Sequence, residues 1–194
     1  MADNYKIILA SQSPRRKELL SQLNIPFDIL IKEEVEEIFP SGMPADEVPL
    51  FLAREKAKPY HDDCKKDNLL VITADTVVYC DGKILGKPAD KAEAVRMLQG
   101  LSGKAHEVIT GVALTTGQRQ AGFTARTKVF FKSLTADEIH YYIDHYQPFD
   151  KAGAYGIQEW IGMVGIERIE GSYFNVVGLP VQRLYTELKT FNIQ

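Results

Sequence analysis

Several charged side chains of this sequence stand at or soon after the end of short apolar runs, where a strand is expected to end. Asp75 follows the run 69–74, and Arg15 and Arg16 follow the run 6–10 after a short Ser-Gln-Ser-Pro segment. A carboxylate held at a strand end can coordinate Mg²⁺ or take a proton from water. Two guanidinium groups at the start of a helix suit the oxygens of a phosphate. These residue types favour a phosphate site and a carboxylate that acts as a base or metal ligand.

Each of these features also has a simpler structural interpretation. Ser13 is a good N-cap and Pro14 a good first helical residue, and arginines that follow such a start are most often solvated. Asp75 alone fits a turn in which its carboxylate accepts a hydrogen bond from a following backbone amide. Both interpretations stay open, although the position of the arginines after a buried strand favours the phosphate site.

The stretch 33–37 and two lysines offer further charge. Glutamate occupies four of its five positions, so it can supply a second carboxylate to a metal or form a solvated loop; these residues are Glu33, Glu34, Glu36 and Glu37. Lys56, late in an expected helix, is by itself typical of a surface lysine. Lys87 lies in a Gly-Lys-Pro loop, a kind of segment that often carries function.

A glycine-rich region in the last quarter of the chain offers hydrogen-bonding groups. The stretch 150–158 ends at Gln158, and the stretch 171–180 again combines glycines with aromatic residues. Glycines allow the backbone to approach a ligand closely, and an amide side chain can both donate to and accept from the edge of a base. Tight packing of loops is the competing interpretation.

The composition is that of an ordinary soluble globular protein. The chain has 194 residues, 45% of them hydrophobic, and a net charge of −3, which argues against binding nucleic acid mainly by charge. Its two cysteines, Cys64 and Cys80, and its four histidines show no metal-ligand or triad spacing, and the common glycine-rich phosphate loops are absent. No apolar run suits a signal peptide or a membrane span, so we expect a cytoplasmic protein.

Hydrophobic periodicity and turn residues predict strands mixed with helices. The expected strands are 6–10, 27–31, 69–74, 77–79 paired with 83–85, and a long hairpin of 106–114 with 122–131. The expected helices are 14–23, 46–60, 92–98, 136–146 behind a capping box at Thr135 and Glu138, and 181–191, with an irregular stretch from 149 to 178. Because long hairpins exclude a purely parallel pattern, we expect an α/β fold. We expect this fold to contain a mixed, curved β-sheet with flanking helices. The sheet and helices should form two lobes around a central cleft, in a single domain of residues 1–194.

Six ordered motifs together resemble the Maf family of nucleoside triphosphate pyrophosphatases, a family formerly linked to septum formation and similar in fold to inosine triphosphatases. They are IILASQSPRRKELL at 7–20, LAREKA at 52–57, ITADTVV at 72–78, GKP at 86–88, DKAGAYGIQ at 150–158 and GSYFNVVGLP at 171–180. The match spans nearly the whole chain.

The resemblance implies hydrolysis of a nucleoside triphosphate between its α and β phosphates, with Mg²⁺ or Mn²⁺. On the family's motifs Asp75 matches the proton acceptor, and Glu37 matches a second catalytic carboxylate that would hold the metal with Asp75. Glu36 stands beside Glu37, and the register between the two stays open. The positions that match phosphate handling are Ser11, Arg15, Arg16, Lys56 and Lys87.

The same resemblance implies a choice of substrate. The positions associated with this choice are matched by Arg15, Thr76 and Gln158. The sequences of their motifs resemble those of the branch that acts on dTTP and UTP. Two alternatives stay open: a pyrophosphatase for 7-methyl-GTP or inosine triphosphate, and a nucleotide-binding regulator of cell division that needs no turnover. The expected partner is a small nucleotide rather than nucleic acid or membrane, and the family suggests a homodimer.

Overall fold

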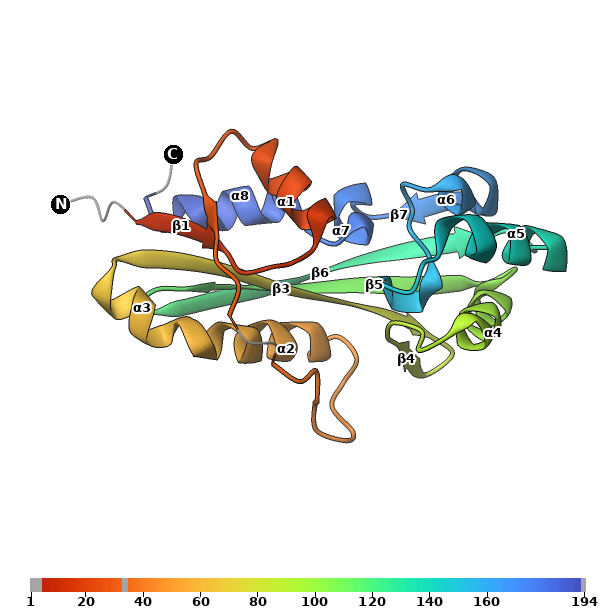
Figure 1. The fold of residues 1–194 in the computed structure, drawn as a ribbon, viewed down its shortest axis with the longest axis horizontal. Coiled ribbons are helices and arrows are strands. Elements are labelled where there is room, and N and C mark those ends of the chain that lie inside the picture. Colours follow the sequence, from red (N-terminus) through yellow and green to blue (C-terminus); the bar gives the residue numbers. More distant parts are fainter. Residues whose placement is uncertain (1–4, 33–34, 193–194) are drawn as a thin grey trace. The chain divides into compact units, whose positions relative to one another are not determined.

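A computed structural model describes residues 5–32 and 35–192 (Figure 1). In the described part of the chain one mixed sheet has the strand order β2-β1-β3-β5-β6-β7, and β4 pairs with β3. The strands are β1 Lys6–Leu9, β2 Asp28–Ile29, β3 Leu69–Cys80, β4 Lys83–Leu85, β5 Ala105–Thr115, β6 Gln120–Phe131 and β7 Ile166–Glu170. The predicted mixed α/β fold is confirmed.

Helices flank this sheet. The α-helices are α1 Pro14–Ser21, α2 Val48–Ala57, α3 His61–Lys66, α4 Lys91–Leu101, α5 Ala136–Tyr146, α6 Trp160–Gly165, α7 Tyr173–Val177 and α8 Val181–Lys189. Two short 3₁₀ helices are η1 Lys58–Tyr60 and η2 Ala152–Ala154. The chain divides into two compact units: the described parts of Met1–Asp75, Thr110–Ala125 and Gly178–Gln194 form the first, and Thr76–Ile109 with Arg126–Val177 form the second.

In the first unit, β1 pairs in parallel with both β2 and β3. Three consecutive residues of β1 are buried, as expected of a parallel strand covered on both faces. Gly111 of β5 lets α2 approach the sheet at backbone distance, since a Cβ there would lie 2.2 Å from the backbone nitrogen of Leu50. Helix α2, which carries Lys56, is therefore held firmly on the sheet.

In the second unit, α4 and α5 pack against each other and against the sheet residues of a shared apolar core. The start of α5 has the predicted capping box: Thr135 and Glu138 each accept a hydrogen bond from the other's backbone amide. His106, Phe131 and Tyr155 meet edge to face, with ring centroids between 5.0 and 5.4 Å apart. His106 is a strand residue, as its sequence context predicts.

Three expectations about the elements are wrong. Strand β3 runs unbroken from Leu69 to Cys80, so Asp75 lies inside a strand and not at its end. The β-branched residues after Asp75 continue the strand, and Val78–Cys80 pair with β4. Helical structure also continues past Tyr60 into α3, because Pro59 stands in the first turn of η1, where a proline is tolerated.

The third wrong expectation concerns the stretch 149–178, which is not irregular. It contains η2, α6, β7 and α7. Its glycines mark close packing instead of disorder: a Cβ at Gly162, inside α6, would lie 1.9 Å from the carbonyl oxygen of Ile157. A glycine that is required for close packing has the same appearance in a sequence as one that breaks a helix.

Candidate active site

The segment between β1 and α1 forms the capped helix start that its residues predict. Pro14 is the first helical residue, and the Ser13 side chain accepts a hydrogen bond from the backbone N–H of Arg16 at 3.4 Å. The Ser11 hydroxyl in turn accepts one from the backbone N–H of Ser13 at 3.2 Å. These contacts shape the turn and leave the positive end of α1 beside the side chains of Arg15 and Arg16.

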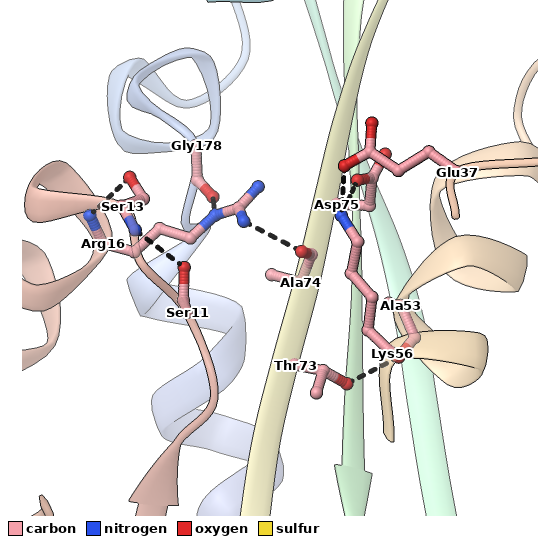
Figure 2. A network of polar contacts seen from close by, with 10 residues as sticks. All are labelled: Ser11, Ser13, Arg16, Glu37, Ala53, Lys56, Thr73, Ala74, Asp75 and Gly178. Atoms are coloured by element: carbon pink, nitrogen blue, oxygen red, sulfur yellow. Dashed lines mark hydrogen bonds and ion pairs between the residues drawn. The ribbon is translucent and has the colours of Figure 1, made fainter. Parts of the chain in front are cut away.

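Arg16 joins three distant segments of the first unit (Figure 2). Its Nε donates to the carbonyl oxygen of Gly178 at 2.8 Å, and its Nη1 donates to that of Ala74 at 2.8 Å. Burial lowers the pKa of the Arg16 guanidinium, and the charge of Asp75 opposes this effect. The guanidinium stays charged, so it places positive charge beside β3 and fixes the peptide that precedes Asp75.

Lys56 bridges two carboxylates, as Figure 2 shows. From the last turn of α2 its Nζ lies 2.5 Å from Oδ1 of Asp75 and 2.8 Å from Oε1 of Glu37. The carboxylates come from β3 and from the loop before α2. Glu36 and Glu37 are both exposed, and it is Glu37 that pairs with Lys56 at the site. Glu33 and Glu34 lie outside the described residues.

The environment of Asp75 suits a base. Only 6% of the residue is exposed. Burial raises the pKa of its carboxyl group, and the nearby Glu37 adds to this effect, while the positive charges of Lys56 and Arg16 oppose it. A buried carboxyl whose pKa is raised, and which sits among specific charge partners, is a good candidate for proton transfer at neutral pH.

A buried threonine ties α2 to β3. The Thr73 hydroxyl donates to the carbonyl oxygen of Ala53 at 2.6 Å, one helical turn before Lys56 and two residues before Asp75 (Figure 2). This contact was not predicted from the sequence. The only signal was a hydroxyl residue within an apolar run, and nothing in the sequence identifies a partner twenty residues away.

Asp75 and Glu37 fit a divalent cation as a pair. Both place an oxygen against one positive atom, the Lys56 ammonium nitrogen, so the two carboxylates already share a cation position. Within residues 5–32 and 35–192 no three His, Cys, Asp or Glu side chains gather into a fuller metal site. Mg²⁺ commonly takes only one or two carboxylates and completes its shell with water and substrate phosphates, so two carboxylates are compatible with such an ion.

The remaining predicted residues are placed as follows. Arg15 lies in the first turn of α1, next to Arg16, and Thr76 follows Asp75 within β3. Lys87 follows β4, and Gln158 is exposed in a turn before α6; both belong to the second unit. The first unit thus brings together Ser11, Arg15, Arg16, Glu37, Lys56 and Asp75, while the joint action of Lys87 and Gln158 with them stays a prediction.

The comparison with known families agrees with the motifs. A family model described as "Maf-like protein" matches residues 6–191. The chain belongs to the Maf family. The resemblance inferred from the sequence is confirmed.

Several relatives of this Maf chain carry the same name. A Bacteroides fragilis protein named "dTTP/UTP pyrophosphatase" is 56% identical over 187 residues, which cover 96% of each chain. A Porphyromonas gingivalis protein of that name is 52% identical over 195 residues, 98% of each chain. The solved structure of a HAM1 protein from Coxiella burnetii is similar in fold, with a TM-score of 0.50, 16% identity and coverage of 96% of this chain and 99% of that one.

In the described part of this Maf chain, no helix has the length and apolar character needed to cross a membrane.

Proposed function

We propose that this Maf protein hydrolyses dTTP and UTP to the monophosphate and pyrophosphate, with residues 1–194 acting as one catalytic domain. The observation that carries the proposal is the buried carboxylate of Asp75, which shares the Lys56 ammonium with Glu37 beside the Arg16 guanidinium. Relatives with this name, at 50–56% identity over most of the chain, support the choice of nucleotides.

In this proposal Asp75 is the proton acceptor. A water molecule attacks the α phosphorus in line with the bond to the β phosphate. Its oxygen forms a new bond to phosphorus as the bond to the bridging oxygen breaks, and Asp75 receives the proton. A raised pKa makes the carboxylate a better base than an ordinary exposed aspartate.

The cationic residues hold the triphosphate and stabilise the charge that develops on leaving pyrophosphate. Phosphoryl transfer depends mainly on positioning and electrostatics, so four basic side chains and a helix start can supply much of what it needs. In this proposal the four basic residues are Arg15, Arg16, Lys56 and Lys87, and Ser11, in the segment between β1 and α1, binds phosphate with them. Asp75 and Glu37 would hold Mg²⁺ or Mn²⁺, which when bound supplies further positive charge to the phosphate oxygens.

Base choice is assigned in this proposal to Arg15, Thr76 and Gln158. Uracil and thymine present an acceptor at O4 and a donor at N3, and the Gln158 amide can pair with both. Cytosine presents the opposite pattern at these positions, so an amide held in the orientation that suits uracil cannot pair with it. Strong discrimination arises where a bound substrate covers a polar group and leaves it unpaired.

The setting of this activity is also a proposal. We place the protein in the cytoplasm as a homodimer that binds nucleotides and neither nucleic acid nor membrane. The net charge of −3 supports the exclusion of nucleic acid, and the other points rest on the resemblance to the family.

A nucleotide panel tests the proposal. The purified full chain is mixed with Mg²⁺ or Mn²⁺ and with dTTP, UTP, CTP, GTP, inosine triphosphate or 7-methyl-GTP, and released pyrophosphate is measured. We expect dTTP and UTP to react fastest and Asp75→Asn to lower their rates by about 10²- to 10⁴-fold. Equal rates for Asp75→Asn and the unchanged protein, or preference for a purine, would contradict the proposal.

A further inference from the structure

Gln158 stands in a tight turn whose two ends are held. The backbone N–H of Glu159 donates to the carbonyl oxygen of Gly156 at 3.0 Å, so Ile157 and Gln158 are the two central residues. Gln158 is exposed while Gly156 is buried. The position of an exposed side chain at such a tip depends on how firmly the ends of the turn are anchored.

One hydroxyl anchors both ends. Tyr142, in the middle of α5, is completely buried. Its hydroxyl oxygen accepts a hydrogen bond from the backbone N–H of Gly156 at 3.0 Å, and the same hydroxyl donates to Oε2 of Glu159. Burial and the Glu159 carboxylate raise the pKa of Tyr142 well above its ordinary value, so the hydroxyl keeps the proton that it donates.

Lys151 supports this arrangement from the other side. Its Nζ lies 3.0 Å from Oε1 of Glu159, and only 10% of the lysine side chain is exposed. The ion pair packs directly on Gly156, where a Cβ would lie 2.9 Å from Cδ of Glu159 and 3.0 Å from Cε of Lys151. The glycine, the tyrosine and the ion pair therefore fit together as one rigid support under the turn.

We propose that Tyr142 is a positioning residue for base recognition: its hydroxyl, supported by the Lys151–Glu159 ion pair, fixes the turn that presents Gln158 to the nucleotide base. The inference rests on the proposed function, because it takes Gln158 as the residue that reads uracil and thymine. It adds residues from the core of the second unit to those that determine selectivity.

The conservative substitution Tyr142→Phe removes only the hydroxyl. We expect the KM for UTP and dTTP to rise about tenfold and kcat to change by less than about twofold, because a loosened Gln158 amide loses binding that the substrate and the transition state share. The preference for UTP over CTP should fall about tenfold, because the loosened amide also loses base discrimination. Tyr146→Phe is the matched control, since Tyr146 stacks on Tyr142 from the next turn of α5 and is 38% exposed. The control should leave all three values unchanged.

Two further variants keep the test decisive. Glu159→Gln weakens the same support without touching the core, and serves if Tyr142→Phe proves too unstable in thermal unfolding. Gln158→Ala sets the scale of the effect. If Gln158→Ala lowers selectivity while Tyr142→Phe and Glu159→Gln do not, the positioning role is wrong and the proposed function stands. If Gln158→Ala also leaves selectivity unchanged, the positioning role fails together with base reading by Gln158.

A binding measurement separates this inference from catalysis. The dissociation constants of α,β-imido UTP and α,β-imido CTP, which cannot release pyrophosphate, are measured with Mg²⁺ for the same variants. If the unchanged protein releases no pyrophosphate, the proposed reaction is refuted. If Tyr142→Phe nevertheless loses the preference for the UTP analogue, the positioning role is supported. Unchanged relative affinities in Tyr142→Phe would overturn the role whatever the activity.

Discussion

A carboxylate buried as deeply as Asp75 is costly for a fold unless cations compensate its charge. Lys56 and Arg16 do so in this protein, yet burial still outweighs their effect on the pKa of Asp75. The residue is therefore kept at some expense of stability, as is common for residues selected for chemistry. Burial also acts on His106 in the second unit, where it lowers the pKa to about 4.

Asp75→Asn should stabilise the protein. Because the folded state raises the pKa of Asp75, folding favours the neutral carboxyl, and the charged form at pH 7 lowers the free energy of unfolding. We expect Tm at pH 7, measured without divalent cations, to rise by about 3 °C. The gain should shrink as pH falls through the raised pKa of Asp75, since the native aspartate then becomes neutral. A lower Tm for the variant at pH 7 would show that the ion pair of Asp75 with Lys56 stabilises the protein by more than the burial of Asp75 destabilises it.

His106 should make stability fall in mildly acidic solution. Its folded pKa of about 4 lies below the unfolded value of 6.5, so the unfolded chain binds more protons between these values and stability is lost as pH falls through them. The full effect is about 3 kcal/mol in the free energy of unfolding. His106→Gln should flatten this pH dependence in urea unfolding, whereas His140→Gln, at an exposed position of α5, should not. Parallel pH profiles of His106→Gln and the unchanged protein would contradict the prediction.

At the scale of elements, helix α2 is the part that brings Lys56 to Asp75. It is held on the sheet at two places, by the close approach of Leu50 to Gly111 and by the hydrogen bond from Thr73 to Ala53. The second contact lies within one helical turn of the lysine. Because the helix is anchored beside Lys56, this long and flexible side chain can keep one position. A loop would hold the side chain less firmly.

Thr73→Val tests this support, because valine keeps the shape of threonine and removes its hydroxyl. We expect a loss of about 1 kcal/mol in the free energy of unfolding and a several-fold fall in kcat for UTP, since small misplacements of catalytic groups are costly. Thr124→Val, at an exposed position of β6, is the control and should change neither value. A fall in stability with unchanged kcat would limit Thr73 to a structural role.

At the scale of the whole molecule, the proposed reaction asks a protein of net charge −3 to bind a substrate with several negative charges. Local cations and a metal, rather than the overall charge, must supply the attraction. In the first unit, cations from α1 and α2 gather around one carboxylate of β3. As metal ligands, Asp75 and Glu37 would leave most of the ion's shell to water and phosphate.

Removal of divalent cations should therefore stop the reaction. With excess chelator we expect pyrophosphate release from UTP to fall by at least about 10²-fold, because the metal neutralises phosphate charge. Added Mg²⁺ or Mn²⁺ should restore it, and Glu37→Gln should need a higher metal concentration for half of its own maximal rate. Glu36→Gln is the matched control, since it makes the same change at the neighbouring exposed position while the Lys56 ion pair is made by Glu37. Full activity under chelation would refute the metal requirement.

Features that depend on neighbouring residues were predictable from the order of amino acids alone. The cap at Ser13, the capping box at Thr135 and the long hairpin of β5 and β6 were all predicted, because their hydrogen bonds and turns join residues close in the chain. The motifs also identified the family and the residue types for phosphate chemistry. The hydrophobic pattern did not predict that β3 continues through Asp75, since a charged residue normally ends a buried strand.

Which side chains meet could be known only once the chain was seen folded. The contacts of Lys56 with Asp75 and Glu37 cross nineteen positions of the chain, and that of Arg16 with Gly178 crosses 162. The anchoring of the Gln158 turn by Tyr142 likewise joins separate elements. Such contacts depend on strand register and on how closely helices approach the sheet. Those quantities arise from the packing of the whole core, so no local pattern of residues contains them.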